Sequence, residues 1–99
     1  MQAIVDAALD RSVDESTARL VAPLVARLRR RGADVRRGEL DRLATRLGDL
    51  DDRQREAVEA LAAGIVGKLL HEPTVRMKDS AGTARGERLA EALRDLFDL

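Results

Sequence analysis

The sequence has no cysteine, no tryptophan and no tyrosine, and Phe97 is its single aromatic residue. Without cysteine the chain can form no disulfide, no thiolate metal site and no thiol nucleophile. Proteins that hold single-stranded nucleic acid usually stack its bases on aromatic side chains, so this composition removes that binding mode. A chain without disulfides is compatible with a reducing compartment, and we expect it to be cytoplasmic.

The chain also lacks a net charge and a long apolar run. Its 18 Lys and Arg residues balance 18 Asp and Glu residues, so no net field attracts nucleic acid or an anionic membrane. No apolar run approaches the ~20 residues that span a bilayer, and the first eleven residues lack the pattern of a signal peptide. We therefore expect no membrane partner, and 99 residues suffice for one domain.

The residues that are present favour helices. Ala, Leu, Arg, Glu and Asp dominate, and apolar residues recur at steps of three, four and seven between residues 2 and 47. A helix could begin at Ser12, which forms a capping-box pattern with Glu15, but the apolar stripe reaches back to Leu9 and favours Ser12 inside the helix. Pro23 predicts a bend rather than an end. Whether this helix continues through Gly32 and Gly38 stays open.

The length of this first helix predicts a second copy of the chain. A helix over residues 2–47 would be ~65 Å long at ~1.5 Å per residue, whereas a compact domain of this size has a radius of gyration of ~13 Å. The remaining residues are too few to cover such a stripe, and another copy is the simplest cover. The alternative is a helix that breaks at Gly32 or Gly38 and folds back into a monomeric bundle.

Three further helices are expected. Asp51 and Gln54 form a capping-box pattern that opens a second helix over residues 52–71. Pro73 suits the first position of a short helix over 73–80, and a flexible connection leads to a last helix over 87–97. The sequence thus predicts an all-α fold in which a long, bent spinal helix precedes two or three shorter helices and pairs into a dimeric helical bundle.

We expect the dimer contacts on the two longest stripes. Gly64 and Gly67 in the second helix would let another backbone approach closely, which also suggests a packing surface. The predicted interface residues are Leu9, Val13, Leu20, Leu24, Leu28, Val35, Val58, Leu61, Ile65 and Leu69.

No catalytic, cofactor-binding or metal-binding residue is predicted. His71 is the only histidine and has no partners at metal-ligand spacing, so we interpret it as the end of the second helix. Asp49, Asp51 and Asp52 do not match a calcium loop and are better explained by capping.

A basic run extends from Arg27 to Arg37 and supports two interpretations. It could contact phosphates, which would make the chain a small helical RNA-binding or protein-interaction adaptor. It could instead be a solvated face, balanced by Asp34, Glu39 and Asp41.

The segment KLLHEPTVRMK (residues 68–78) and the final LF-x-L (residues 96–99) resemble the C-terminal dimerisation domain of glutamyl-tRNA reductases. Pro23, the AIVD of residues 3–6 and the APL of residues 22–24 also keep that family's spacing. The sequence departs from the family pattern at Gly67, where Asn is usual, and at Asp98, where Gly is common.

The resemblance implies a parent enzyme that uses NADPH to reduce glutamate esterified to its tRNA to glutamate-1-semialdehyde, at the entry to tetrapyrrole (porphyrin and haem) biosynthesis. In that family a catalytic cysteine and a Rossmann domain lie upstream, and a spinal helix joins them to helices that pair two subunits. The expected partners are therefore a second copy, the upstream domains and glutamyl-tRNA as the parent's substrate. The chain itself should be catalytically inert and hold no cofactor.

Overall fold

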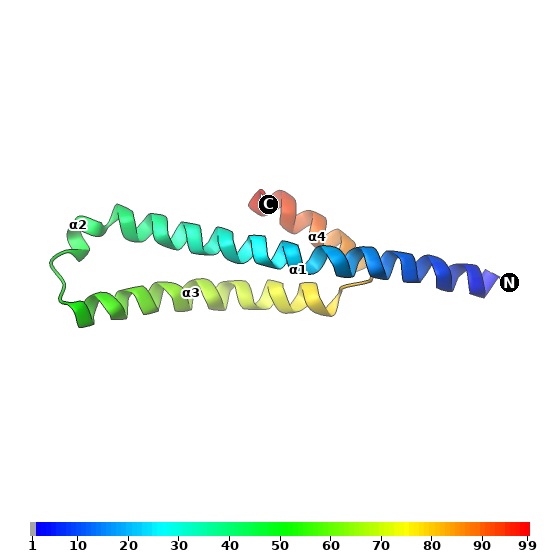
Figure 1. Cartoon of the computed structure of the whole chain (residues 1–99), viewed down its shortest axis with the longest axis horizontal. Coiled ribbons are helices and arrows are strands. Elements are labelled where there is room, and N and C mark those ends of the chain that lie inside the picture. The colour runs from blue at the N-terminus through cyan, green and yellow to red at the C-terminus, as the bar shows by residue number, and fades with distance from the viewer. Residues whose placement is uncertain (1) are drawn as a thin grey trace.

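The computed structural model shows helices joined by short turns, with no strand among residues 2–99 (Figure 1). It describes the backbone of residues 2–99 and the side chains of Arg19 and residues 21–99. In chain order the helices are α1 (Gln2–Arg42), α2 (Ala44–Leu47), α3 (Asp52–Asp79) and α4 (Ala84–Phe97). The expectation of an all-α fold, in which one long helix precedes shorter ones, is confirmed.

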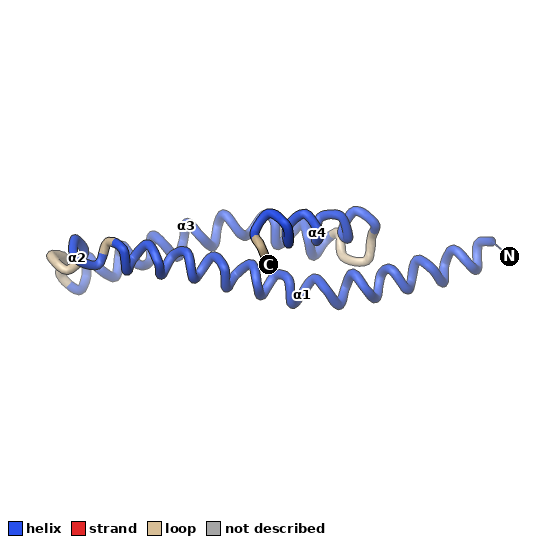
Figure 2. Tube along the Cα trace, turned by 90° about the horizontal axis from the view of Figure 1, so that it is seen from above, coloured by secondary structure: helices blue, strands red, loops and turns tan. Residues whose placement is uncertain are grey.

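The long helix continues through every position where the sequence left a break open. α1 runs without interruption past Ser12, Pro23, Gly32 and Gly38, so the chain does not fold back at either glycine. Figure 2 shows α1 bowed along its length rather than straight. It ends at Arg42 instead of residue 47 because Leu43 (φ −98°, ψ 8°) leaves helical geometry before α2 completes the turn.

The capping box at the start of α3 is confirmed. The Asp51 carboxylate accepts a hydrogen bond from the Gln54 backbone N–H at 2.8 Å, and the Gln54 side chain accepts one from the Asp51 N–H at 3.1 Å. These bonds satisfy two backbone donors that a helix start leaves unpaired. The turn at residues 48–51 therefore reverses the chain at a defined place.

The predicted break between residues 71 and 73 is wrong, because α3 continues through Pro73 to Asp79. An interior proline removes one backbone hydrogen bond and costs about 3 kcal/mol. The turn that follows Pro73 buries Thr74 and Met77, and the side chains of Glu72 and Arg76 pair across it at 3.3 Å. Packing of the next turn thus outweighs the local preference to stop.

The last helix begins at Ala84, three residues earlier than expected, because Thr83 caps it. The Thr83 hydroxyl oxygen accepts a hydrogen bond from the Gly86 N–H at 3.0 Å and donates one to the Ser80 carbonyl at 2.6 Å. A side chain on Gly86 would overlap that carbonyl oxygen. The connection expected to be flexible is therefore a tight turn, with Gly82 at φ 83°.

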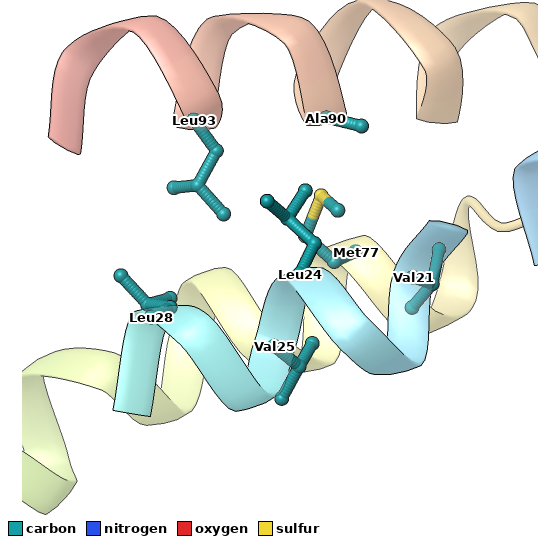
Figure 3. Packing of buried hydrophobic residues seen from close by; sticks show 7 residues of the cluster. All are labelled: Val21, Leu24, Val25, Leu28, Met77, Ala90 and Leu93. Atoms are coloured by element: carbon teal, nitrogen blue, oxygen red, sulfur yellow. The ribbon is translucent and has the colours of Figure 1, made fainter. Parts of the chain in front are cut away.

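The core lies where three helices meet. α1 and α3 run side by side in opposite directions, and α4 folds back over them from the end of α3 (Figures 1 and 2). Figure 3 shows one cluster drawn from all three helices, in which Leu24 of α1 lies beside Met77 of α3, and Ala90 and Leu93 of α4 lie above them. The α1 members are Val21, Leu24, Val25 and Leu28.

The molecule is long and thin. Its extents are 71 × 21 × 15 Å and its radius of gyration is 19.1 Å, compared with ~13 Å for a compact domain of this size. The three-helix core occupies only one section of this rod, so a two-helix hairpin extends beyond it towards α2 (Figure 1).

Candidate protein interface

An apolar groove runs along this two-helix hairpin, and we call it the tip groove. Its volume is about 330 Å³. Nine of its eleven lining residues are apolar, which excludes it as a site for polar substrates. The lining residues are Val35, Arg36, Glu39, Leu40, Leu43, Leu47, Val58, Leu61, Ala62, Ile65 and Val66.

The tip groove is open because α4 is too short to cover it. Leu28 and Val35 lie seven residues apart and so share one face of α1. Leu28, beneath α4, is 0% exposed, whereas Val35 is 54% exposed. The same stripe is therefore core at one end and bare surface at the other.

The apolar face continues along α3. Val58, Leu61, Ile65 and Leu69 recur at steps of three and four, which places them on one side of the helix. Leu61 is 63% exposed and Leu69 is 70% exposed. A helix face this apolar and this exposed is typical of a protein contact surface.

Beyond Leu69 this face meets a second groove of about 280 Å³ between α3 and α4. Pro73 and Met77 line it from α3, and Leu89 and Leu93 line it from α4. Leu96 follows Leu89 and Leu93 on the same stripe of α4 and is 80% exposed.

One ion pair lies beside the tip groove, and another lies beside the groove between α3 and α4. Arg42 and Glu39 pair at 2.7 Å, and hydrogen bonding to Arg42, with its charge, holds the pKa of Glu39 below its usual value. The same contacts raise the pKa of Arg42. This pair and the Glu72–Arg76 pair are exposed, so they add little stability.

The structure divides the predicted interface residues into three groups. Val35, Val58, Leu61 and Ile65 line the tip groove, and Leu69 lies on the same side of α3. Leu24 and Leu28 are buried inside the single chain, which leaves them almost no surface for a partner. The side chains of Leu9, Val13 and Leu20 lie outside the described residues.

Sequence reasoning left some surface residues out of the interface. Leu40, Leu43 and Leu47 form a second stripe after Gly38, and all three line the tip groove. Their periodicity was a usable signal. Leu96 is also exposed, because α4 turns its Ala90–Leu93 side towards the core.

Within the single chain, the close approach of two helices lies at Gly32. A Cβ on Gly32 would lie 2.8 Å from side-chain carbons of Val66 and Leu70, so this glycine lets α1 and α3 touch. Among the described residues, nothing lies within 4 Å of a Cβ at Gly64 or Gly67, so the structure leaves both positions open to another chain.

The arginine run is interspersed with acidic groups. Arg27, Arg30 and Arg31 line a cavity of about 210 Å³ together with Asp34 and Asp98. Arg36 and Arg37 line another, of about 670 Å³, together with Asp41, Glu56 and Glu59. Mixed charge of this kind favours the solvated-face interpretation over a phosphate-binding surface.

His71 does not end a helix as expected. It is exposed in the middle of α3, because α3 continues to Asp79. Within the described part of the chain, no three His, Asp or Glu side chains are grouped so that they could hold a metal ion. No described helix is both long enough and apolar enough to cross a membrane.

Comparison with known proteins identifies one family. The family described as "Glutamyl-tRNAGlu reductase, dimerisation domain" matches residues 1–99. The glutamyl-tRNA reductases of Frankia casuarinae and Frankia alni are 50% and 48% identical over all 99 residues, which is 21% of each relative. That of Myxococcus xanthus is 43% identical over 90 residues, which is 90% of this chain and 20% of the relative.

The chain thus spans about a fifth of the length of the curated relatives it matches. No solved structure matches it. Because the match covers the whole chain, this protein belongs to the family of glutamyl-tRNA reductase dimerisation domains.

Proposed function

We propose that this chain joins two subunits of a glutamyl-tRNA reductase and that the tip groove and the Val58–Leu69 face of α3 form the contact. The parent enzyme would use NADPH to reduce glutamyl-tRNA to glutamate-1-semialdehyde for tetrapyrrole biosynthesis, in the cytoplasm. Its catalytic and NADPH-binding domains would be separate from this chain, which contains no thiol nucleophile.

The observation that carries the proposal is the exposure of one continuous apolar face. Val35, Leu61, Ile65 and Leu69 are each more than half exposed although they are large aliphatic residues on regular helices. Because each side chain is already partly buried in its own chain, completing its burial would stabilise an association by roughly 1–1.5 kcal/mol each before association costs are counted. A second copy offers a matching face, as two-fold pairing requires.

Sedimentation equilibrium of the chain at micromolar concentration tests this proposal. We expect a dimer, and we expect Ile65→Arg to raise its dissociation constant at least roughly a hundredfold, because burying an unpaired charge costs several kcal/mol. Ile65 is exposed within one chain, so the variant should keep its helices. A charge at the fully buried Leu28 would unfold the chain and report nothing about the interface.

Ala60→Lys is the matched control, because Ala60 is exposed and lies about 100° or more around α3 from Leu61, Ile65 and Leu69. It should leave the dimer unchanged. A wild-type chain that sediments as a monomer would contradict the proposal, and so would an Ile65→Arg variant that dimerises as tightly as the Ala60→Lys control.

A further inference from the structure

We infer that the two copies pair antiparallel, so that the end of α4 of one copy, with Leu96 and Phe97, enters the tip groove of the other. This arrangement rests on the proposed pairing and specifies its geometry. It makes α4 a contact element of the dimer as well as part of the core of its own chain.

Each chain carries both a recess and a projection on the same side. The recess is the tip groove, where α1 and α3 lie side by side without a third helix. The projection is α4, which lies on the α1 stripe at Leu24 and Leu28 and on the Pro73–Met77 part of α3. Val35 continues that α1 stripe, and Ile65 and Leu69 continue that α3 face. The groove and α4 therefore lie next to each other on one side of the molecule, the first recessed and the second raised.

The projection ends in apolar side chains that its own chain leaves bare. Leu93 is buried in the core, but Leu96, one turn further, is 80% exposed, and Phe97 is also exposed. No described ion pair covers this end of α4. The projection therefore matches the recess in chemistry, because both are apolar.

Two contacts show how far along the rod the C-terminal end of α4 reaches. Gly32 of α1 lies against Val66 and Leu70 of α3. Leu99 lies beside α1 residues 27–34, so α4 ends near the level of Leu69 and Leu70 on α3. The centre of the tip groove is near Leu61, eight residues or ~12 Å from Leu69.

An antiparallel two-fold axis that crosses α3 near Ile65–Leu69 then brings each α4 end onto the other copy's tip groove. Because the axis is two-fold, the contact forms twice: α4 of each copy packs against the tip groove of the other. Parallel pairing would instead set α4 against α4. Because a helix with its side chains is ~10–12 Å across, that would hold the two tips apart and leave both grooves open.

Cross-linking between single-cysteine variants tests the arrangement, and the absence of cysteine from the chain removes any background. Leu61→Cys and Leu96→Cys are suitable because both side chains are largely exposed, so neither variant should lose the fold. The two variants are refolded together and treated with a short bis-maleimide. We expect a covalent dimer between residues 61 and 96 in the mixture and little product from either variant alone.

Leu69→Cys alone should cross-link to itself, since it lies near the inferred axis. The matched control is Ala60→Cys mixed with Leu96→Cys, which should give little product, because Ala60 is exposed and faces about 100° or more away from Leu61 and Ile65. Self-linked Leu61→Cys and Leu96→Cys would show parallel pairing and overturn the inference. A dimer by sedimentation that yields no 61–96 product would overturn it as well. A chain that sediments as a monomer would instead contradict the proposed function.

Discussion

Asp98 ends α4 in a left-handed conformation, with φ 53° and ψ 55°. The Leu99 N–H reaches back to the Arg94 carbonyl at 2.9 Å, a bond that closes the last turn. Only glycine adopts such a conformation without a steric penalty from Cβ. A glycine at this position would carry no such penalty.

Replacement of Asp98 by glycine should stabilise the chain by about 0.5–1 kcal/mol, because the strain at Cβ disappears. Urea unfolding followed by circular dichroism would measure the gain. Asp98→Ala is the control and should be less stable than wild type, since alanine tolerates positive φ less well than aspartate. A glycine variant that loses stability would show instead that the carboxylate interacts with Arg27, Arg30 or Arg31 in the cavity they share.

At the scale of the helices, two glycines of α1 differ in what surrounds them: one lies at a helix contact and the other faces open space. Gly32 lies where α1 touches α3. Gly38 lies six residues further along α1, and no described atom lies within 4 Å of a Cβ there. The two glycines are alike in the sequence, since each interrupts the same helical stripe. Only the packing of α3 distinguishes them.

Gly32→Ala should destabilise the chain by about 1–3 kcal/mol, because Val66 is stiff at χ1 and cannot move away without separating the helices. Gly38→Ala should stabilise it by up to about 1 kcal/mol through helix propensity alone. Thermal unfolding of the two variants beside wild type measures both effects. Equal and favourable shifts for both would mean that α1 and α3 do not approach closely at Gly32.

Local signals predicted the start of α3 but neither its end nor the start of α4. Asp51 was identified as a cap because its capping box is local chemistry within four residues. Pro73 was misread because the turns that sustain α3 beyond it depend on burial of Thr74 and Met77. The Thr83 cap lacks a comparable sequence signal, because Gly86, three residues later, has no Glu or Gln side chain to complete a capping box.

At the scale of the whole molecule, the sequence predicted how much apolar surface must be covered but not where. Leu28 and Val35 are indistinguishable members of one stripe, and their different exposure follows from where α4 ends. The length of α1 indicated an elongated shape, in agreement with the 19.1 Å radius of gyration. The position of a returning helix depends on a turn and a core cluster that no periodicity encodes.

This division of the rod predicts two zones of stability. Around Leu28 and Met77 three helices share a core, whereas around Leu61 only α1 and α3 meet. Local opening is easiest where few buried apolar contacts resist it. In a monomer, amide hydrogens of α3 near Leu61 should therefore exchange faster than those near Met77.

Hydrogen exchange read by mass spectrometry would check this in wild type and in Ile65→Arg. If a second copy covers the tip groove, wild type should protect residues 52–66 at least roughly tenfold more than the variant, because each ~1.4 kcal/mol of added cover slows opening tenfold. Protection near Met77 should change little. An Ile65→Arg variant that loses protection equally at both zones would mean that the three-helix core also depends on the partner.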